Sequence, residues 1–368
     1  MKISLSRENL LKALQKVSGV VEKRQTMPIL GNVLLEVHNQ TLTLTASDLE
    51  IETRAQTELE SSDGDFATTL PAIKLLTIVR SLPEGLTVVM QFEEGRCELA
   101  AGRSRFKLST LPAEDFPTID LSQVVLSFAL SQHQLKSLIH RTAFAMAAQD
   151  VRFYLNGMLF DIQNCQLRVV ATDGHRLSTC ATQLAVEELP ASQAILPRKG
   201  VLELQKLLQD EETLVEMALA QNYLTVQLED TTFTCKLVDG RFPDYRRVIP
   251  ADNEQTLVTQ CDLLKSLLQR AAILSNDKFK GVRLVLAENL LTVHAQNTEQ
   301  EESHEDMVVD YQGAPMEIGF NVNYLLDVLN VFPQEEVVLK FKDANSCCLI
   351  ESEDACCQCQ HVIMHMRL

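Results

Sequence analysis

The sequence predicts an α+β fold in which one unit of roughly 125 residues occurs three times. Three observations support this: a strand–turn–strand pattern that recurs at a fixed offset, helical segments that recur with it, and apolar residues that alternate within the strands. A chain of 368 residues is also too long for one ordinary hydrophobic core. We therefore expect three similar domains, against the alternative of one large domain with accidental periodicity.

The strand–turn–strand pattern is the clearest repeat. It begins at Pro28 (PILGNVLLEVHNQTLTLTASDLE), at Phe153 (FYLNGMLFDIQNCQLRVVATDGH) and at Phe279 (FKGVRLVLAENLLTVHAQNTE). The shared glycines Gly31, Gly157 and Gly281 lie 126 and 124 residues apart. Apolar residues at every second position are typical of antiparallel strands with one buried face.

Two helices accompany each copy of this pattern. Apolar residues at helical spacing predict opening helices over 7–24, 131–146 and 261–280, and second helices over 71–84, 197–210 and 321–333. Ser6, Ser131 and Asp262 are the expected N-caps, and proline opens two of the second helices. The repeats place the domains at 1–124, 125–253 and 254–368, with helices on one face of the sheets and domains side by side, edge to edge.

Basic residues concentrate in the predicted helices of an acidic chain. The formal net charge is −17, yet the six helical segments hold 16 Lys and Arg against 8 Asp and Glu. A positive helical face on an acidic protein would attract phosphates on one surface and repel them elsewhere. Lys and Arg that only keep surface helices soluble remain the simpler alternative. We find no base-reading motif, so contact with the DNA backbone is favoured over sequence recognition.

The chain has no apolar run long enough for a membrane span and no apolar leader near its start, so we expect a cytoplasmic protein without membrane partners. Cys97, Cys165, Cys180, Cys235 and Cys261 are scattered singly and are expected to be small buried thiols. Cys356, Cys357, Cys359, His361 and His365 crowd the C-terminus. Their spacing lacks the C-x₂-C form of zinc sites, so we expect an oxidation-sensitive loop and no metal, with zinc as the open alternative.

Asp173 and His175 could be imagined as a general base pair. No nucleophile motif such as G-x-S-x-G accompanies them. We also find no Gly-rich phosphate loop of Walker type. The sequence therefore favours a protein that is not an enzyme and needs no cofactor.

Six longer segments resemble one known family. They are MPILGN (Met27–Asn32), GRSRFKLSTLPAEDFP (Gly102–Pro117), QDVRFYLNGMLF (Gln149–Phe160), VATDGHRLS (Val170–Ser178), LPRKGV (Leu196–Val201) and KLVDGRFPDYRRVIP (Lys236–Pro250), and the terminal MHMRL completes them. In this order, along the whole chain, they resemble the bacterial replicative sliding clamps, the β subunits and processivity factors of DNA polymerase III.

The resemblance implies a head-to-tail homodimer that closes into a ring around double-stranded DNA and performs no chemistry. Its implied partners are the catalytic subunit of DNA polymerase III, a clamp loader, and other DNA polymerases and repair proteins that bind through short linear peptides. Implied DNA contacts are Arg24, Lys74, Gln149, Phe153 and Tyr154. The family often has Arg in place of Ile73 and Tyr in place of Phe153, so weaker or relocated contacts are expected.

The resemblance also implies two protein-binding surfaces. The partner-peptide cleft between the second and third domains would use Leu155, Thr172, Gly174, His175, Arg176, Leu177, Pro243, Arg247, Val248, Tyr324, Val362, Met364 and Met366. His365 stands where the family often has Pro, which would loosen one wall. The dimer interface would join a basic-apolar patch of the first domain to an apolar-acidic patch of the third: Arg96, Arg103, Arg105 and Phe106 against Ile273, Leu274, Glu301, Glu302 and Glu305.

Two functions from other classes stay open at this stage. One is an enzyme built around Asp173 and His175, which a sensitive hydrolase screen would expose. The other is an acidic interaction scaffold that does not encircle DNA, which would be retained on neither linear nor circular plasmid.

Overall fold

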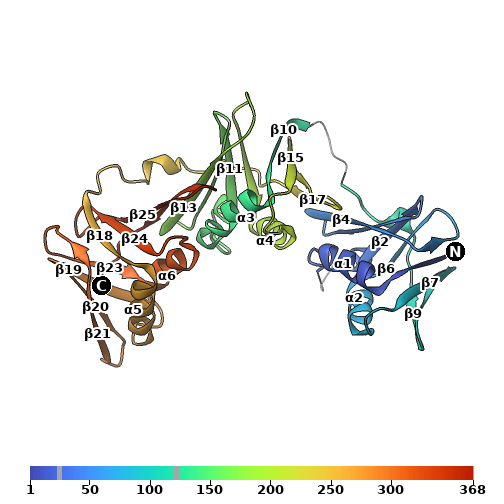
Figure 1. The fold of residues 1–368 in the computed structure, drawn as a ribbon, viewed down its shortest axis with the longest axis horizontal. Helices are drawn as coiled ribbons and strands as arrows, with labels where there is room; N and C mark the ends of the chain where they lie inside the picture. The colour runs from blue at the N-terminus through green and yellow to red at the C-terminus, as the bar shows by residue number, and fades with distance from the viewer. Residues whose placement is uncertain (23–26, 120–123, 368) are drawn as a thin grey trace. The chain divides into compact units, whose positions relative to one another are not determined.

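The structure is a computed structural model that describes residues 1–22, 27–119 and 124–367. It divides into two compact units. Unit 1 combines Met1–Leu130 with Thr213–Leu237, and unit 2 combines Ser131–Glu212 with Val238–Leu368. The division cuts through the second sequence repeat, whose strands contribute to both units (Figure 1).

Unit 1 holds two antiparallel sheets and two helices, α1 (Arg7–Val17) and α2 (Ala72–Ser81), which pack against each other. A five-stranded sheet has the order β5-β1-β7-β8-β9, and an eight-stranded sheet has the order β10-β15-β16-β17-β4-β3-β2-β6. The strands are β1 (Lys2–Ser6), β2 (Asn32–His38), β3 (Thr41–Ser47), β4 (Ile51–Glu58), β5 (Ser61–Ser62), β6 (Phe66–Pro71), β7 (Thr87–Glu93), β8 (Arg96–Ala101), β9 (Ser104–Ser109), β10 (Val124–Ser131), β15 (Leu214–Ala220), β16 (Tyr223–Gln227) and β17 (Thr231–Lys236).

Unit 2 holds the other four helices, α3 (Gln132–His140), α4 (Arg198–Leu207), α5 (Cys261–Ile273) and α6 (Val322–Val331), packed as two pairs. Its sheets have the orders β14-β11-β12-β13-β26-β25-β24-β18-β22 and β21-β20-β19-β23. The strands are β11 (Gly157–Gln163), β12 (Gln166–Thr172), β13 (Arg176–Gln183), β14 (Ser192–Pro197), β18 (Gln255–Gln260), β19 (Gly281–Ala287), β20 (Leu290–Gln296), β21 (Glu302–Val308), β22 (Asp310–Tyr311), β23 (Met316–Asn321), β24 (Glu336–Phe341), β25 (Cys348–Glu353) and β26 (Gln358–Ile363).

The α+β repeat is confirmed. Each predicted strand–turn–strand segment is an antiparallel hairpin: β2–β3, β11–β12 and β19–β20. The turns of the first two hairpins consist of residue pairs with positive φ, Asn39–Gln40 and Asn164–Cys165. A two-residue turn needs this conformation to match the right-handed twist of its strands. The first residue of β11 is Gly157, and a glycine fits there because an added Cβ would lie 2.6 Å from the carbonyl oxygen of Leu196 on β14.

The helices are shorter than the sequence predicts. The residues that follow α1, α3 and α5 leave the helix soon after one apolar face has been covered, so the predicted ends at 24, 146 and 280 were wrong. Ser6 and Ser131 are N-caps as expected, and Ser131 forms a capping box with Gln134. Asp262 is not an N-cap: β18 runs directly into α5, so Gln260 takes that position and Asp262 lies in the first turn.

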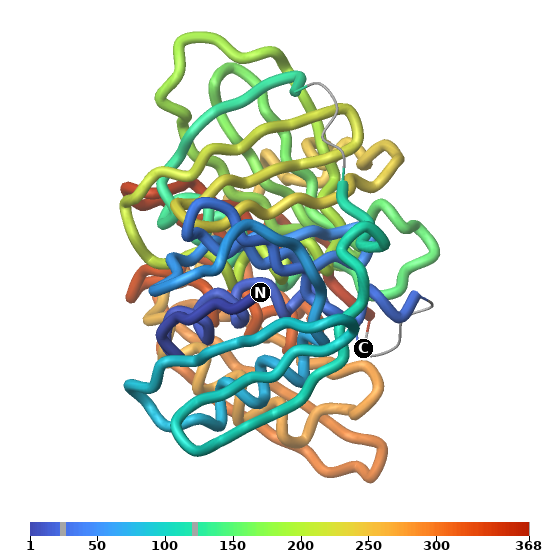
Figure 2. Tube along the Cα trace, turned by 90° about the vertical axis from the view of Figure 1, so that its right-hand side faces the viewer, coloured from blue at the N-terminus to red at the C-terminus, as the bar shows by residue number. Residues whose placement is uncertain are grey.

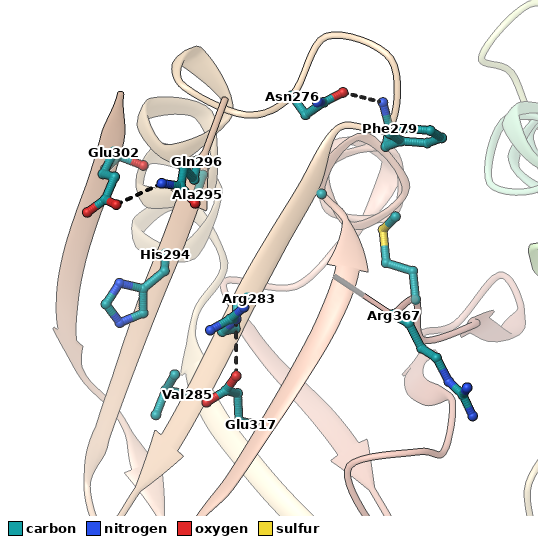
Figure 3. Close-up of a pocket in the computed structure, with 13 residues that line it drawn as sticks. Asn276, Phe279, Arg283, Val285, His294, Ala295, Gln296, Glu302, Glu317 and Arg367 are labelled. Carbon is teal, nitrogen blue, oxygen red and sulfur yellow. Dashed lines mark hydrogen bonds and ion pairs between the residues drawn. The ribbon is translucent and has the colours of Figure 1, made fainter. Parts of the chain in front are cut away.

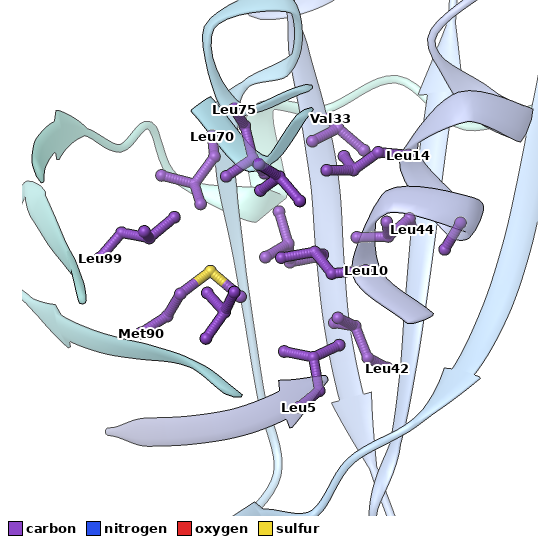
Figure 4. Close-up of a cluster of buried hydrophobic side chains, with 14 of the residues drawn as sticks. Leu5, Leu10, Leu14, Val33, Leu42, Leu44, Leu70, Leu75, Met90 and Leu99 are labelled. Atoms are coloured by element: carbon purple, nitrogen blue, oxygen red, sulfur yellow. The ribbon is translucent and has the colours of Figure 1, made fainter. Parts of the chain in front are cut away.

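The helices bury their apolar faces against the sheets. In the first repeat Leu10 and Leu14 of α1 and Leu75 of α2 meet Leu5 and Met90 of the five-stranded sheet, and all five are fully buried (Figure 4). Burying a leucine side chain contributes about 2 kcal/mol, so this face fixes the helices more firmly than their intrinsic propensity. In the described part of the chain, no helix is long and apolar enough to cross a membrane.

Two sheets continue from one repeat into the next. Strand β17 of the second repeat pairs with β4 of the first, and β26 of the third repeat pairs with β13 of the second. In the second pairing Arg176 lies opposite Ile363, and Leu177 lies opposite Val362. Figure 2 follows the long hairpins along the Cα trace, β8–β9 in teal and β20–β21 in orange. Repeats are therefore joined by backbone hydrogen bonds as well as by apolar contacts.

The cysteine prediction was partly wrong. Cys97, Cys235 and Cys261 are buried thiols as expected, whereas Cys165 in a hairpin turn is only partly buried. Cys180 is not a free thiol: it forms a disulfide with Cys359, its direct cross-strand neighbour on β26. The two residues are 179 positions apart in the sequence, so the pairing follows from the sheet and not from local spacing.

His361 is a buried polar residue at the same junction. Its Nδ1 lies 2.8 Å from Ser178 Oγ, which also donates to the carbonyl oxygen of Arg141. Burial, with a smaller contribution from the Arg141 guanidinium, lowers the pKa of His361 to about 3. The imidazole is therefore neutral in the folded protein at any pH above that value.

This burial makes stability depend on pH. Below the unfolded pKa of about 6.5 the unfolded chain binds a proton at His361 that the folded chain refuses until about pH 3, so stability falls as the pH is lowered. We expect His361 to account for a loss of about 2 kcal/mol between pH 6.5 and pH 5 in urea unfolding followed by circular dichroism. The His361→Gln variant should lose this part of the slope, and His38→Gln, at an exposed histidine, should keep it. Equal slopes in the two variants would contradict the assignment.

Candidate functional site

The turn between β12 and β13 carries several predicted cleft residues. Asp173 Oδ1 accepts hydrogen bonds from the backbone N–H groups of His175 (2.9 Å) and Arg176 (3.0 Å). Thr172 Oγ1 accepts from Gly174 N and donates to the carbonyl oxygen of Arg176. Gly174 has φ +90°, a conformation that favours glycine. The turn therefore has one defined conformation, set by its own side chains.

The same geometry weakens the hypothesis of a catalytic Asp–His pair. The carboxylate of Asp173 accepts from two backbone N–H groups, and its Oδ2 lies 3.1 Å from Arg176 Nε. The His175 ring stacks on Tyr324, with ring centroids 6.4 Å apart. Both groups are thus engaged in holding the turn and its neighbours.

Arg176 is the most heavily contacted residue of the site. Its Nη1 lies 2.5 Å from Asp327 Oδ2 on α6, and its Nη2 donates to the carbonyl oxygen of Phe144. Its guanidinium lies over the ring of Tyr324 at 4.5 Å and near that of Phe144 at 5.2 Å. Together with Asp173, these contacts use the N–H donors of the planar guanidinium, an arrangement that a Lys ammonium could not reproduce. They tie the second repeat to α6 of the third.

The C-terminal tail is held at two points. Met364 N donates to the carbonyl oxygen of His175 at 2.9 Å, and Met366 N donates to that of Gly319 at 2.8 Å. The first bond reaches the β12–β13 turn of the second repeat, and the second reaches β23 of the third. The side chain of Met364 remains 41% exposed although its backbone is fixed.

An apolar cluster lies beneath these groups. Leu155, Leu177 and Val362 are fully buried in it, together with Phe242 and Tyr245 from the segment that also carries Pro243, Arg247 and Val248. Val248 is 43% exposed, and Arg247 extends into solvent with Asp244 as its ion-pair partner at 3.0 Å. Leu155, Leu177 and Val362 therefore share one buried cluster, and the segment that supplies Phe242 and Tyr245 to it also carries three further predicted cleft residues. The contacts described above link a second set of predicted cleft residues: Thr172, Gly174, His175, Arg176, Tyr324 and Met364.

Met366 differs from the other predicted cleft residues. It lines a cavity of about 630 Å³ on the four-stranded sheet of the third repeat, with Phe279, Arg283, His294 and Glu317 (Figure 3). Arg283 and Glu317 pair with each other across β19 and β23 at 3.1 Å. The sequence did not predict this cavity, because its lining comes from residues two apart on several different strands.

The predicted DNA contacts divide into three groups. Gln149, Phe153 and Tyr154 lie close together on the segment that precedes β11, where Phe153 is 57% exposed and its ring meets Tyr154 edge-on at 5.9 Å. Lys74 lies exposed on α2 in unit 1. Arg24 falls outside the described residues.

Arg152 is a neighbour that the sequence analysis missed. It lies between the predicted DNA contacts Gln149 and Phe153, is partly exposed, and pairs with Asp150 at 2.9 Å. The hydrogen bonds from Arg152 lower the pKa of Asp150 to about 2. Arg152 also lies beside Gly174, where an added Cβ would be 3.1 Å from its Nη2. The sequence signal that could have identified Arg152 is its place in the segment QDVRFYLNGMLF, between Gln149 and Phe153.

The helices keep their positive charge although they are shorter than predicted. Within their observed bounds they carry eleven Lys and Arg and four Asp and Glu. Most of the surplus lies on α1, α2 and α4, and α6 carries no basic residue. The strands and loops of the chain therefore hold its acidic excess.

The predicted dimer patches lie at open sheet edges. Strand β9 is the last strand of the five-stranded sheet and exposes Arg105 and Lys107. Strand β21 is an end strand of the four-stranded sheet and contains Glu302 and Glu305. Arg96 and Arg103 are exposed, Phe106 and Leu274 are partly buried, and Ile273 at the end of α5 is 77% exposed.

The acidic members of this surface have partners in their own chain. Glu305 pairs with Arg270 at 2.6 Å, Glu302 accepts from Gln296 at 2.9 Å, and Glu301 accepts from Asn297 at 2.6 Å. Arg105 Nη1 likewise donates to the carbonyl oxygens of Gly102 and Ser104. These charges are therefore held in fixed positions by contacts within the chain.

Two of the C-terminal cysteines lie close to Cys180 of the second repeat. The sulfur atoms of Cys180, Cys357 and Cys359 lie within 4.8 Å of one another, but two of them share the disulfide bond. His361, another residue of the C-terminal group, forms a hydrogen bond with Ser178. The disulfide leaves one free thiol in this group, which does not fit the four-ligand set of a zinc site.

These observations define a class of protein. Three α+β repeats share continuous sheets, two sheet edges remain open, and a preformed apolar and arginine-centred site lies where two repeats meet. This is the architecture of a DNA clamp subunit.

Comparison with known proteins identifies the family. Three family profiles match along the chain, the N-terminal, central and C-terminal domains of the DNA polymerase III beta subunit, at residues 1–120, 129–244 and 246–367. The chain belongs to this family, the beta sliding clamps. It is 51% identical to the beta sliding clamp of Proteus mirabilis and 50% identical to that of Escherichia coli K12, over the full length of each.

Solved structures agree. A sliding clamp of Pseudomonas aeruginosa bound to griselimycin superposes with a TM-score of 0.96 at 46% identity, and the match covers all of both chains. The DNA polymerase III beta subunit of Caulobacter crescentus superposes with a TM-score of 0.92 at 35% identity, again over both full chains. The fold and family predicted from the sequence are confirmed.

Proposed function

We propose that the chain is a DNA sliding clamp: a homodimeric ring that encircles duplex DNA and tethers DNA polymerases, which makes their synthesis processive. The observation that carries the proposal is the way in which the sheets cross repeat boundaries. Within the chain, strand pairs join the first repeat to the second and the second to the third. One edge strand then remains unpaired in the first repeat and one in the third, so a second copy is needed to pair these two edges.

The pairing pattern is regular. Each repeat has two half-sheets, one ending on β9, β17 or β26 and the other on β4, β13 or β21. Within the chain, β17 pairs with β4, and β26 pairs with β13. The equivalent third pair is β9 with β21, which lie in the first and third repeats. Joining β9 of one copy to β21 of another gives a head-to-tail contact, and two such contacts close a ring.

The chemistry of the two edges supports this contact. Strand β9 presents Arg105 and Lys107, and β21 presents Glu302, Glu305 and Asp306. Ile273, at the end of the helix beside β21, offers exposed apolar surface. An open edge strand can pair with the strands of many other chains. Opposite charges on the two edges favour pairing with one partner.

Contact with DNA would be electrostatic and independent of sequence. The surplus of Lys and Arg on the helices supplies phosphate-binding groups, while the acidic strands and loops repel DNA from the other surfaces. Arg24, Lys74, Gln149, Phe153 and Tyr154 stay the proposed contacts. Ile73 is apolar, so we expect the first repeat to depend on its neighbour Lys74.

The site around Arg176 is the proposed partner-peptide cleft. Its buried floor, exposed Met364 and Val248, and polarised rim suit an extended peptide with apolar anchors. Its proposed occupants are short linear segments of the polymerase III catalytic subunit, the clamp loader, and other polymerases and repair proteins. One relative of known structure, the sliding clamp of Pseudomonas aeruginosa, is bound to griselimycin.

Three further assignments complete the proposal. The protein performs no catalysis, since Asp173 and His175 are committed to the turn and to Tyr324. It acts in the cytoplasm. Its proposed clamp domains are residues 1–124, 125–253 and 254–368; the first strands of the second and third repeats begin within one residue of these bounds, at Val124 and Gln255.

The ring itself can be tested by topology. The protein, loaded by a clamp loader with ATP onto nicked circular plasmid, should stay bound at salt concentrations that abolish binding to short duplexes, because retention is mechanical and phosphate contact is salt-sensitive. Linearising the plasmid should release it within minutes, as followed by gel filtration. Retention on linear DNA, or on neither form as for an acidic scaffold, would refute encirclement.

The dimer contact can be tested by charge. Reversing Arg105 and Lys107 together to Glu places like charges opposite the acidic strand β21 and should convert dimers to monomers in sedimentation equilibrium. Far-ultraviolet circular dichroism should be unchanged, because both side chains are exposed. Arg80→Glu, a reversal on helix α2 away from the edge, is the control and should leave the dimer intact. Dimers that survive the double reversal would place the interface elsewhere.

The cleft can be tested by truncation. Removing Met364–Leu368 deletes the segment bonded to His175 and Gly319, and should weaken binding of a fluorescent peptide containing Gln followed by Leu and Phe at least about 100-fold in anisotropy titrations. Dimerisation should persist. Leu214→Ser removes an exposed leucine on β15 and serves as a control that should bind normally. Native affinity in the truncated dimer would show that the cleft is wrongly assigned.

A further inference from the structure

A group of four cysteines lies at the junction of the second and third repeats, apart from the peptide site. Cys180 on β13 and Cys359 on β26 lie directly opposite each other and form a disulfide. Both residues are fully buried, so no molecule in solution reaches their sulfur atoms in the folded chain. The bond is a covalent link across the two strands that join the repeats.

A third sulfur lies against this bond. Cys357 Sγ is 3.6 Å from Cys359 Sγ, which is close to van der Waals contact for two sulfur atoms. Cys357 is a free, buried thiol in the turn that precedes β26. It therefore has access to the disulfide that solvent lacks.

The turn that carries Cys357 is held in place by its neighbours. Asp354 Oδ1 accepts from the backbone N–H groups of Cys356 (2.9 Å) and Cys357 (3.0 Å). Asp354 Oδ2 pairs with Arg141 Nη2 at 2.6 Å, and Arg141 Nη1 donates to Cys357 Sγ at 3.1 Å. The hydrogen bond to Cys356 and burial raise the pKa of Cys357, and the Arg141 guanidinium only partly opposes them. Cys357 is therefore a neutral thiol at rest and must pass its proton to a neighbouring group before it attacks a disulfide.

Cys356 is the outermost of the four. It is only partly buried, and ligand atoms of Asp354, Cys356 and Cys357 lie within 4.8 Å of one another. A hydrogen bond from Cys357 is the main cause that lowers the pKa of Cys356 to about 6, and the nearby His133 and Arg141 add to the effect. A thiol that ionises near neutral pH at a partly open position is suited to exchange with solution thiols.

We propose that Cys356 and Cys357 form a thiol–disulfide exchange relay that connects the buried Cys180–Cys359 bond to low-molecular-weight thiols in solution. The order of the sulfur atoms from solvent inward is Cys356, Cys357, Cys359, Cys180. The relay makes the covalent link between the repeats responsive to the thiol pool, although the link itself is inaccessible.

The exchange balances in three stages. The Cys356 thiolate takes the proton of Cys357, and the Cys357 sulfur attacks Cys359 Sγ; the Cys180–Cys359 bond breaks, and Cys180 leaves and takes up a proton. Cys356 then loses its proton and attacks Cys357 Sγ, and Cys359 leaves and takes up a proton. A solution thiolate attacks Cys356 Sγ, Cys357 leaves and regains a proton, and a second solution thiolate releases Cys356 as a thiolate. Two solution thiols thus become one disulfide, and their two protons balance those gained by Cys180 and Cys359.

Reduction of the disulfide through the relay would change how the second and third repeats are held together. When the bond is reduced, β13 and β26 are held by backbone hydrogen bonds and packing alone, and the same strand pair carries Arg176, Leu177 and Val362 of the peptide site. In the cytoplasm proposed above, persistent disulfides are uncommon and those that form usually exchange. A relay of this kind fits that setting better than a permanent staple does.

The relay is tested by the rate of reduction. The oxidised full-length protein is incubated with reduced glutathione under native conditions, quenched with N-ethylmaleimide, and digested without reductant. Mass spectrometry then measures the fraction of Cys180 still joined to the C-terminal peptide. We expect Cys357→Ser and Cys356→Ser each to slow the loss of this cross-link at least about tenfold, because each removes one step of the relay.

Two controls keep the result interpretable. Cys97→Ser removes a buried thiol in unit 1 and should leave the rate unchanged. Thermal unfolding of each oxidised variant shows whether it is folded, and Cys356→Ser alters a partly exposed position that tolerates the change. Reduction at the parental rate in both relay variants would mean that the junction opens to solvent directly, and would overturn the proposal. So would oxidised protein in which Cys180 is not cross-linked to Cys359.

Discussion

The edges of the β-sheets are the constraint on which the rest of this structure depends. A strand at an open edge exposes backbone N–H and C=O groups that need partners, and each repeat ends both of its half-sheets on such a strand. Within the chain these edges pair across repeat boundaries, β17 with β4 and β26 with β13. The second repeat consequently contributes to two compact units and is not an independent domain in its contacts.

The candidate peptide site is a product of one of these junctions. Pairing of β13 with β26 places Leu177 beside Val362 in the buried floor and leads the chain to Met364, whose backbone bonds to His175. Arg176 then links the turn to α6 through Asp327 and Tyr324. Neither repeat alone contains these contacts, so the site depends on the integrity of the junction. The disulfide lies on the same strand pair, and Cys356 and Cys357 lie in the turn that leads into β26.

Charge is distributed by structural element. The helices carry more basic than acidic residues, whereas the chain as a whole is strongly acidic. A net charge of −17 therefore does not argue against a DNA partner, because phosphate responds to the local field of the surface that it meets. Ion pairs such as Arg270–Glu305 also orient the charges at the open edge, which favours one geometry of contact over nonspecific attraction.

The sequence by itself determined what local patterns encode: three repeats, their hairpins, six helices, two of three N-caps and the family. It misjudged the ends of α1, α3 and α5, where tertiary packing decides how far each helix runs, and the cap at Asp262, because β18 runs directly into α5. Only the tertiary structure decided the cross-repeat strand pairing, the Cys180–Cys359 bond and the contacts around Arg176. The physical reason is distance along the chain: periodicity reports which face a residue buries, but not which strand 179 residues away will cover it.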